Sequence, residues 1–464
     1  MTNEALENMK TLTLVFEYIL GRKTMTERQQ QNEKEVVEPY RREIIRLKSS
    51  PSFRIGAHIV KSFEKPWRLL FIWFSLPVVL WNVARERWGK RTPEYSGEYI
   101  PSSNPQKNSI ILFPTNGVGF GHFTRILAVA RRIRKLEPDL EIIFFTTMPT
   151  LHILSEEGFS AYHVSGRSHF SNMDAKTWNT ICEEMLRSII VAHQPKAFIF
   201  DGSFPYRGML DAIKNNDEIT KVWMKRGMYK KRKNNIPIDS LNHFDVLMVP
   251  IEHKNTELPS ANGVKVLGIN PITLLEKADL LDRSVIRSRL GIPDGGILVY
   301  LQLGAGRINK IDSEINLTLD ALLSFKEVNV VIGESMIGER IVCERDRVSI
   351  LRDYPNSMYF NGFDFSIMAG GYNSFHEVIK FNLPTICYPN MNTGKDDQLG
   401  RAELAKEAGC MFVIEKRTKK NIQAAVNEIM SKETRDRMRK NSESIQYTDG
   451  AEEGAKHIID LINK

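Results

Sequence analysis

From residue 108 onward, short runs of apolar residues alternate with longer segments that have the spacing of helices. Apolar runs occupy residues 109–115, 141–147, 197–201, 221–225 and 245–250 in the first half, and 297–303, 329–333, 386–390 and 411–415 in the second. Runs of this length separated by helices are typical of parallel sheets that are buried on both faces. The pattern therefore predicts an α/β protein with two Rossmann-like domains that face each other.

The alternation pauses near residues 271–284, which we interpret as a linker. We therefore expect three parts: a helical extension over residues 1–105, an N-terminal Rossmann-like domain over 106–275 and a C-terminal one over 276–464. In open parallel sheets, ligands bind outside the carboxyl ends of the strands. The predicted ligand site is thus a cleft between the two domains.

The extension has a different character from the rest of the chain. Its apolar centre, 69–81, is 13 residues long and contains Pro77. About 20 apolar residues are needed to cross a bilayer, so this stretch is too short to span one.

Basic and aromatic residues surround this centre. Four tryptophans and eight basic residues lie in or beside it: Trp67, Trp73, Trp81, Trp88, Arg54, Lys61, Lys65, Arg68, Arg85, Arg87, Lys90 and Arg91. Tryptophan favours the headgroup layer of a membrane, and basic residues favour anionic lipids. The segment 50–92 is therefore expected to lie on an anionic membrane surface; the alternative is a hydrophobic helix that packs on the protein body.

The overall charge changes this picture little. The formal net charge of +8 is compatible with an anionic membrane, a phosphorylated substrate or a nucleic acid. We expect no nucleic-acid partner, because the basic residues are not gathered on a recognised binding module. The four cysteines are scattered, which predicts neither a zinc site nor a disulfide framework and favours the cytoplasm. The first residues do not have the pattern of a secretory signal.

A glycine-rich turn follows the first predicted strand directly. It contains Asn116, Gly117, Gly119 and Gly121, and His122 stands where the next helix begins. Glycines let the backbone turn tightly and approach a ligand, and N–H groups at a helix start attract anions. We expect the His122 imidazole to point into the cleft and either take a proton from an acceptor hydroxyl or orient that hydroxyl.

Glycines with this spacing also occur in dinucleotide-binding domains, where an acidic residue ends the second strand. The second predicted strand here ends in threonines at 146 and 147, so this alternative has no support from the sequence.

A second set of polar residues opens a helix in the C-terminal half. Gly370 and Gly371 precede the helix, where bare N–H groups and the helix dipole can hold a diphosphate. Ser374 offers a hydroxyl in the first turn. Glu377 lies one turn further, where its carboxylate can accept hydrogen bonds from both hydroxyls of a ribose.

Two residues in the following loop complete this set. Asp397 and Gln398 offer an acceptor and an amide that can recognise the hydroxyls of a sugar. The ordered combination of phosphate, ribose and sugar ligands is more specific than any one of these residues.

Three segments carry a resemblance to a known family: GVGFGHFTR (117–125), GGYNSFHEVIKFNLPTICYPN (370–390) and DDQLGRAELAKEAG (396–409). They resemble the GT-B glycosyltransferases grouped with the peptidoglycan UDP-N-acetylglucosamine transferase and the diacylglycerol galactosyltransferases, glycosyltransferase family 28. The resemblance runs from about residue 109 to 409 and does not include the extension.

The resemblance implies roles for these residues. Glu377 would hold the ribose, Gly371 to Ser374 the diphosphate, and Asp397 with Gln398 the donor sugar. The turn with His122 would lie beside the acceptor and the reacting centre.

A further loop, 301–309, resembles the first phosphate-side loop of the family's second domain. The resemblance places Gly304 and Gly306 at the diphosphate. Ala305 stands where a hydroxyl residue is expected, so only backbone N–H groups would contribute there.

The expected reaction is the transfer of a hexose or N-acetylhexosamine from a UDP-sugar to a hydroxyl of a lipid-linked or cell-surface glycan, at the inner face of the membrane. No cofactor beyond the donor is expected. No D-x-D triplet occurs, so we expect a metal-independent reaction, with Arg226 or Arg307 as candidate partners for the phosphate charge. The alternatives are a non-catalytic subunit that binds a nucleotide sugar and a sugar-nucleotide epimerase. The epimerase would need carboxylates placed for proton abstraction, and Asp201 and Asp211 form no such pattern.

Overall fold

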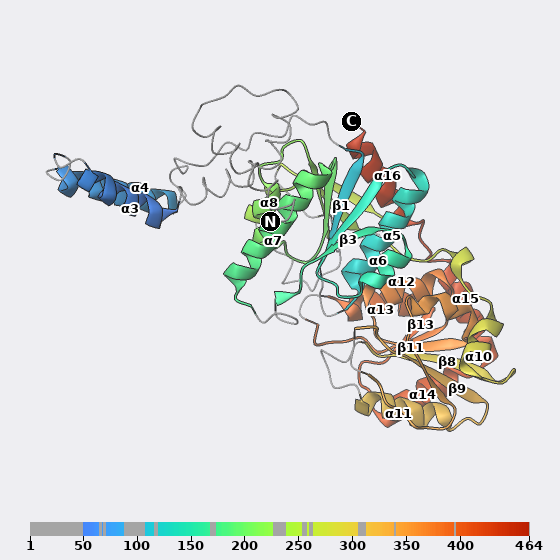
Figure 1. The fold of residues 1–464 in the computed structure, drawn as a ribbon. Helices are drawn as coiled ribbons and strands as arrows, with labels where there is room; N and C mark the ends of the chain where they lie inside the picture. The colour runs from blue at the N-terminus through green and yellow to red at the C-terminus, as the bar shows by residue number, and fades with distance from the viewer. Residues whose placement is uncertain are drawn as a thin grey trace, which may run out of the picture. The chain divides into compact units, whose positions relative to one another are not determined.

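A computed structural model describes residues 50–64, 67, 71–87, 107–115, 119–167, 173–225, 238–252, 258, 263–304, 312–337, 340–393 and 396–463. The chain divides into two compact units, Met1–Pro101 and Ser102–Lys464. The second unit contains two parallel sheets with helices on their faces (Figure 1), as the alternation of apolar runs predicts.

The first sheet has seven parallel strands in the order β3-β2-β1-β4-β5-β6-β7. They are β1 (Ser109–Pro114), β2 (Glu141–Thr146), β3 (Ser160–His163), β4 (Ala197–Asp201), β5 (Thr220–Met224), β6 (Val246–Pro250) and β7 (Lys265–Ile269). The helices described between them are α5 (Gly121–Leu136), α6 (Leu151–Glu156), α7 (Ala175–His193), α8 (Arg207–Ile213) and α9 (Ile238–Leu241). We call this sheet and its helices the N-terminal domain.

Alternate residues of β1, an interior strand of this sheet, face two separate cores. Ile110 and Leu112 of β1 pack in the core that contains α5, whereas Ile111 and Phe113 pack in the core that contains α7 and α8. Because successive side chains of a strand point to opposite faces, a strand that is covered on both sides must be apolar throughout. This is why β1 is a continuous apolar run.

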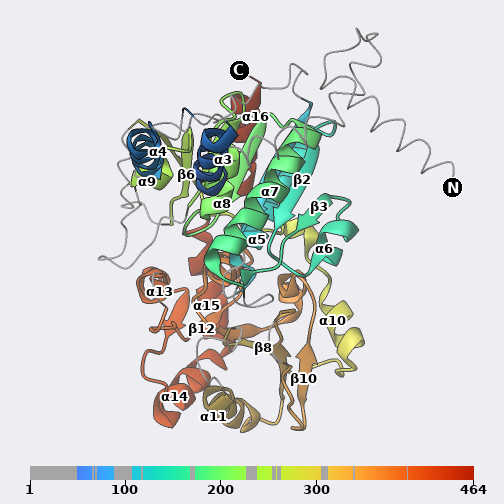
Figure 2. The same ribbon diagram turned by 60° about the vertical axis from the view of Figure 1, so that its left-hand side comes forward.

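The second sheet has six parallel strands in the order β10-β9-β8-β11-β12-β13. They are β8 (Ile297–Gln302), β9 (Val328–Gly333), β10 (Val348–Leu351), β11 (Phe365–Met368), β12 (Thr385–Cys387) and β13 (Met411–Val413). The helices are α10 (Arg283–Leu290), α11 (Asp312–Leu323), α12 (Tyr372–Lys380), α13 (Gln398–Glu407), α14 (Lys419–Ile429) and α15 (Lys432–Glu443), with 3-10 turns η3 (Lys277–Asp279) and η4 (Asn356–Gly362). We call this sheet and its helices the C-terminal domain (Figure 2).

The last helix returns to the N-terminal domain. α16 (Gly450–Ile462) packs on α5, and Ala451, Ala455 and Ile458 are buried in the same core as β1. Arg132 of α5 donates to Asp449, the N-cap of α16, at 2.9 Å. The change from the first sheet to the second therefore falls between β7 and β8, and α16 packs with the first sheet. The division at residue 275 stays a prediction.

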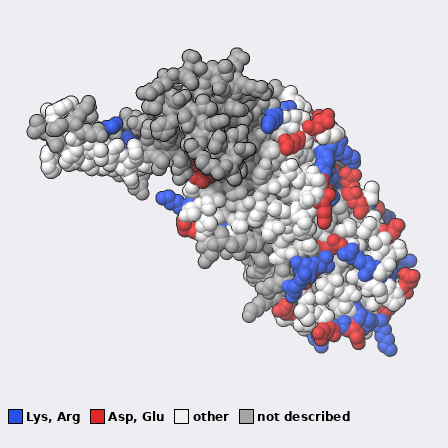
Figure 3. All heavy atoms as spheres, viewed as in Figure 1, with Lys and Arg blue, Asp and Glu red and all other residues white. Residues whose placement is uncertain are grey.

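The unit Met1–Pro101 contributes two described helices, α3 (Pro51–Glu64) and α4 (Ile72–Arg87). They pack against each other as a hairpin, in which His58 Nε2 lies 2.8 Å from Ser75 Oγ. Much of the described surface of this hairpin is uncharged in Figure 3. Its exposed apolar side chains are those of Phe53, Val60, Phe63, Trp67, Phe71, Trp73, Phe74, Val78, Leu80 and Trp81. Among the described residues, no helix is both long enough and apolar enough to cross a bilayer.

The docking of α16 gives a first prediction. A Cβ atom at Gly450 would lie 1.8 Å from the carbonyl oxygen of Asn270, so Gly450→Ala forces the start of α16 away from the linker. We expect a loss of about 1–3 kcal/mol in the free energy of unfolding, the usual cost of overpacking, measured by denaturant titration.

The matched control is Gly454→Ala in the same helix. There the new Cβ would meet side-chain atoms of Met248 and Ile269 at 3.4 and 3.5 Å, which is ordinary contact. Equal stability of the two variants would show that α16 does not dock through Gly450.

Candidate functional site

The first group of polar residues lies where the strand order of the first sheet reverses, between β1 and β4. β1 lies between β2 and β4, and the chain after β1 leads through α5 to β2. A crevice opens at such a point, outside the carboxyl ends of the strands. His122 is the second residue of α5, and Asp201 is the last residue of β4. Strand pairing therefore brings together two residues that are 79 positions apart in the sequence.

His122, Asp201 and Arg125 form a hydrogen-bonded group. His122 Nδ1 lies 2.6 Å from Asp201 Oδ1, and Arg125 donates to both carboxylate oxygens, at 3.0 Å from Nε and 2.5 Å from Nη2. Arg125 Nη2 also lies 3.0 Å from His122 Nδ1. Arg125 has only donors and the carboxylate only acceptors, so a proton on Nδ1 that points to Asp201 satisfies the group. Nε2 is then the nitrogen that accepts a proton.

The charge on Asp201 is fixed by its neighbours. Burial by itself raises the pKa of this carboxyl, but the Arg125 guanidinium and His122 outweigh burial and hold the pKa below its usual range. Asp201 has no exposed surface, whereas 13% of the His122 side chain is exposed. The carboxylate is therefore closed to substrates, and the imidazole is open to them.

The glycines of the first turn have open space beside them. A Cβ atom at Gly119 or Gly121 would meet no other heavy atom within 4 Å. Asn116 and Gly117 lie outside the described residues, as do Arg226, Ala305, Gly306 and Arg307. Their predicted roles remain predictions.

The second group of predicted residues lies at the start of α12. Gly371 is the N-cap of this helix, has no side chain to bond the first N–H groups, and has open space where a Cβ would stand. A helix start with bare N–H groups favours anions. Gly370 is different, because a Cβ there would lie 3.2 Å from Cys387 Sγ and from the carbonyl oxygen of Gln398. Gly371 thus leaves open space beside the helix start, whereas Gly370 is closely packed.

A cleft of about 590 Å³, counting its open mouth, lies beside this helix start. We call it the donor cleft, after the role predicted for Ser374 and Glu377 from the sequence. It is lined by Phe120, Thr124, Tyr300, Gln302, Glu334, Ser335, Met336, Asp353, Tyr354, Pro355, Asn356, Ser357, Phe360, Asn373, Ser374 and Glu377. Ser374 and Glu377 therefore share one cleft, as the sequence predicts. Gly304 lies two residues after β8 and has a φ of +107°, which favours glycine.

Glu377 is buried at the wall of this cleft. Ser357 donates to its Oε1 at 2.9 Å. Burial raises the pKa of Glu377 to about 7, although the Ser357 hydrogen bond and Lys380 act in the opposite direction. The carboxyl group therefore lacks the partners that would keep it fully charged, and ligand hydroxyls that donate to it would supply them.

Asp397 and Gln398 make hydrogen bonds within the protein. Asp397 caps α13 by accepting from the N–H of Gly400 at 3.0 Å. The Gln398 amide accepts from the N–H of Asn390 at 2.9 Å and lies 3.3 Å from Asp396 Oδ2. Neither residue is among the described residues that line the donor cleft. The structure thus unites Ser374 and Glu377 but leaves this pair beside the cleft, and their contact with a sugar stays a prediction.

The two domains meet at the starts of α5 and α12. Asn373 Nδ2 of α12 donates to the carbonyl oxygen of Gly121 in α5 at 3.4 Å. The ring centres of Phe120 and Tyr354 lie 4.9 Å apart, and Thr124 Oγ1 lies 2.9 Å from the Tyr354 hydroxyl oxygen. The two helix starts therefore lie against each other, and residues of both line the donor cleft.

Sequence reasoning missed several of these residues. Arg125 stands one turn after His122, and this spacing places both on one face of α5, a signal that was available. Tyr354, Ser357 and Glu334 follow strands of the second sheet but occur in no glycine-rich motif, so the sequence has no signal for them.

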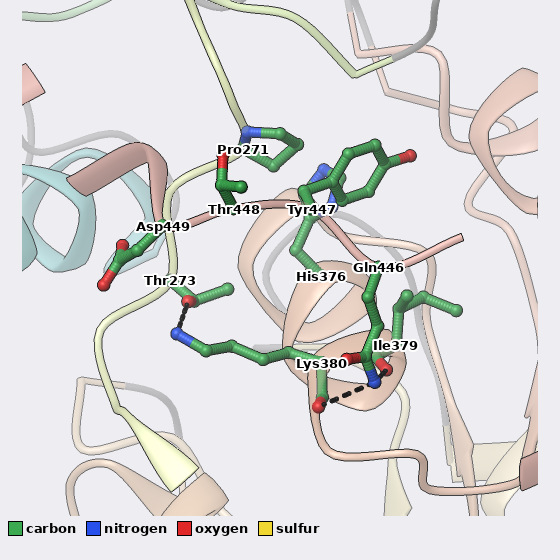
Figure 4. Close-up of a pocket in the computed structure, with 9 residues that line it drawn as sticks. All are labelled: Pro271, Thr273, His376, Ile379, Lys380, Gln446, Tyr447, Thr448 and Asp449. Atoms are coloured by element: carbon green, nitrogen blue, oxygen red, sulfur yellow. Dashed lines mark hydrogen bonds between the residues drawn. The ribbon is translucent and has the colours of Figure 1, made fainter. Parts of the chain in front are cut away.

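A second, smaller cavity lies where the linker and the chain end cross (Figure 4). It is lined by Pro271, Thr273, His376, Ile379, Lys380, Gln446, Tyr447, Thr448 and Asp449. The Lys380 ammonium donates to Thr273 Oγ1 at 2.7 Å, which ties α12 to the linker. Among the described residues, no group of three or more histidine, cysteine, aspartate or glutamate side chains is arranged to hold a metal ion.

Two facing Rossmann-like domains, with a helix that crosses back at the end, define the GT-B fold, and comparison with solved structures agrees. The chain is similar to MurG of Acinetobacter baumannii, with 15% identity, 77% of this chain and 99% of that chain covered, and a TM-score of 0.50. It is similar to the glycosyltransferase of kitacinnamycin (14%, 77% and 100%, TM-score 0.54) and to CalG4, the calicheamicin glycosyltransferase (13%, 78% and 99%, TM-score 0.53). No protein-family model matches the sequence, and no curated protein matches it by sequence. Identities this low show the fold.

The raised pKa of Glu377 gives a second prediction. In the unfolded chain this group has its ordinary pKa of 4.5, so its stabilising protonation is fully present below that pH and is lost as the pH rises through about 7. Glu377→Gln removes the charge and should stabilise the protein at pH 8 by up to about 3 kcal/mol, with little effect near pH 4.5. The measurement is the melting temperature of both proteins across this range.

Glu334→Gln is the matched control in the same cleft and should have the opposite sign. Burial raises the pKa of Glu334, but Arg352 and the N–H of Ile341 outweigh it and lower that pKa. Its charge therefore stabilises the protein above its unfolded pKa, and the Gln variant should be less stable at pH 8. A Glu377→Gln effect that does not change with pH would show that Glu377 is ionised in the native protein throughout.

Proposed function

We propose that the protein is a glycosyltransferase that moves a hexose or N-acetylhexosamine from a UDP-sugar to a hydroxyl of a lipid-linked or cell-surface glycan. The observation that carries this proposal is the meeting of two helix starts in one cleft. His122, hydrogen-bonded to Asp201, begins one helix, and Gly371 begins the other. A base and an anion site at two adjoining helix starts are the two groups that sugar transfer needs.

The base side of the reaction follows from the geometry of His122. The acceptor hydroxyl donates its proton to Nε2 as its oxygen attacks the anomeric carbon. Asp201 holds the Nδ1 proton and stabilises the imidazolium that forms. Asp201 cannot itself reach the acceptor, because it has no exposed surface.

The donor side must stabilise the charge that grows on the leaving diphosphate. The N–H groups at the start of α12 and the Ser374 hydroxyl provide hydrogen-bond donors there. Glu377 would accept from the ribose hydroxyls, which supplies the partners that its buried carboxyl lacks. With these groups we propose a metal-independent transfer in which the UDP-sugar is the donor and no further cofactor takes part. Asp397 and Gln398 are proposed to contact the sugar.

Replacement of His122 tests the proposed function. The donor is first chosen as the nucleotide sugar that most raises the melting temperature, since a ligand of the native state stabilises it. His122→Ala should then lower turnover about 100- to 10,000-fold, the usual contribution of general-base catalysis, and leave the affinity for UDP nearly intact.

His122→Asn separates proton transfer from positioning. An asparagine can still hydrogen-bond an acceptor hydroxyl but cannot take its proton at neutral pH. Normal turnover in this variant alone would make His122 a positioning residue, and normal turnover in both would place the base elsewhere. Donor binding without turnover in the unchanged protein would favour a non-catalytic subunit.

We also propose that the hairpin of α3 and α4 holds the enzyme at the inner, cytoplasmic face of an anionic membrane. Trp73 and Phe74 are 83% and 78% exposed, which is unusual for such large apolar side chains. Both helices also carry basic residues, among them Arg54, Lys61 and Arg85. Exposed tryptophans beside basic residues suit the headgroup layer, where the rings enter the bilayer and the charges meet anionic lipids.

The double variant Trp73→Glu/Phe74→Glu tests this proposal. We expect the affinity for phosphatidylglycerol vesicles to fall at least about tenfold. Each aromatic side chain that enters the bilayer contributes more than about 1 kcal/mol to the free energy of binding. The measurement is cosedimentation of the full-length protein. High salt should release the unchanged protein in part, since exposed charges are screened.

Val342→Glu is the control, because this side chain of the C-terminal domain is also 83% exposed. It should leave vesicle binding unchanged. Equal sedimentation of the double variant and the unchanged protein would show that the hairpin does not bind the membrane.

A further inference from the structure

A buried ion-pair cluster joins the two domains at a second place. Glu252 belongs to the N-terminal domain and lies two residues after the end of β6. Arg401 lies in the first turn of α13 in the C-terminal domain. Their side chains have 0% and 1% exposed surface, and Arg401 Nε donates to Glu252 Oε2. We call Glu252, Arg401 and Asp396 the Arg401 cluster.

The Arg401 guanidinium makes further hydrogen bonds in the C-terminal domain. Nη2 donates to Asp396 Oδ1 at 2.9 Å, and Nη1 donates to the carbonyl oxygen of Gly370 at 2.8 Å. Gly370 comes directly before Gly371, the bare start of α12. Asp396 comes directly before Asp397 and Gln398. One side chain therefore holds the two segments that are proposed to bind the diphosphate and the sugar.

The same guanidinium also reaches the first residue of α12. Arg401 Cζ lies 5.7 Å from the centre of the Tyr372 ring, and Arg125 Cζ lies 5.1 Å from it. Arg125 in turn donates to Asp201, the partner of His122. The Tyr372 hydroxyl accepts from the N–H of Ile272 in the linker at 2.8 Å. Contacts thus run without a break from Glu252 through α12 to the candidate base.

Stability does not account for this cluster. Taking charged groups out of water costs so much free energy that apolar side chains of similar size often serve stability as well or better. His376 Nε2 lies 3.6 Å from Glu252 Oε2. Within the described part of the chain, three buried atoms have no hydrogen-bond partner: Glu252 Oε1 and both ring nitrogens of His376. Burial raises the pKa of Glu252, yet Arg401 and His376 bring it down to about 2, so the charge persists. What such a network does provide is a fixed geometry.

We propose that Glu252 and Arg401 are positioning residues, which fix the donor-binding segments of the C-terminal domain relative to the base of the N-terminal domain. This inference rests on the proposed function. The planar fork of an arginine can hold Glu252, Asp396 and Gly370 at once in fixed directions. Loss of Glu252 leaves Arg401 bonded within its own domain but unties that domain from β6.

Glu252→Gln and Arg401→Lys test the proposal in the full-length protein. We expect kcat to fall about 10- to 100-fold in both, the scale of a misplacement by about 1 Å. The dissociation constant for UDP should stay unchanged in Glu252→Gln, because Arg401 keeps its hydrogen bonds to Gly370 and Asp396 there. Arg401→Lys keeps the charge but loses the fork, so its low kcat would exclude a purely electrostatic role. Full turnover in either variant overturns the proposal.

Asp449→Asn is the matched control. Asp449 pairs with Arg132 at 2.9 Å, but this ion pair fastens α16 to α5 and does not join the two sheets. Asparagine can still cap α16, so the variant removes the charge alone. It should lower the melting temperature without changing kcat. A Glu252→Gln variant that behaves in the same way would make the Arg401 cluster a structural ion pair and overturn the proposal.

Hydrogen exchange separates this proposal from the proposed function. Glu252→Gln should speed amide exchange both in 246–252 and in α13, while Asp449→Asn should not. This result requires no substrate. If the unchanged protein neither binds UDP nor transfers a sugar, the proposed function fails, and the exchange rates still decide whether Glu252 and Arg401 join the domains. Unchanged exchange in Glu252→Gln overturns the proposal.

Discussion

The buried charge of Asp201 sets the arrangement around the candidate base. A carboxylate without exposed surface is costly unless charged or hydrogen-bonding partners surround it. Arg125 donates to both of its oxygens, and His122 lies against one of them. The imidazole is thereby fixed in direction and tautomer without any contact to a substrate. Arg125 must also stay in place, and it does so between Asp201 and the Tyr372 ring.

Asp201 is linked to the C-terminal domain through Arg125, which donates to Asp201 and packs on the Tyr372 ring. Tyr372 opens α12, so the residue that packs on Arg125 is also the residue whose backbone follows the bare N-cap. Movement of α12 would disturb Arg125, and movement of Arg125 would leave Asp201 poorly compensated. The linker N–H of Ile272, which donates to the Tyr372 hydroxyl, limits such movement further. These contacts favour a fixed relation between His122 and α12.

Sequence patterns predict the architecture because buried parallel strands must be apolar on both faces. Nine strands show this signal, but β3, β7 and β10 do not: they are short, and residues such as Ser160, Lys265 and Val348 are partly exposed at or near sheet edges. β11 is buried but only four residues long, and it runs directly into the turn of Gly370. The sequence also does not predict that α16 packs on the N-terminal domain. The pattern of an amphipathic helix shows which of its faces is buried but not which element covers that face.

In the candidate site, too, some residues could be predicted from the sequence and others could not. Ser374 and Glu377 line one cleft together with Phe120 and Thr124, which flank His122. Both motifs follow strands of parallel sheets, so their positions along the chain were enough to bring them together. Long-range pairs cannot be predicted that way: Asp201 lies 79 residues from His122, and Arg401 lies 149 residues from Glu252. The hydrogen bonds of Asp397 and Gln398, by contrast, are local, since their partners are Gly400, Asn390 and Asp396.

The polar groups of the donor cleft differ from those around Asp201 in one respect that bears on function. Asp201 has its partners within the protein, whereas Glu377 has one donor from Ser357 and a pKa raised to about 7. Gly371 likewise leaves the first N–H groups of α12 without a side-chain cap. Natural proteins break the rule that buried polar groups are satisfied mainly where a ligand completes them. Glu377 is an acceptor with too few donors, and the first N–H groups of the same helix are donors without a side-chain acceptor. Together they match a ligand that has hydroxyls at one end and a phosphate at the other.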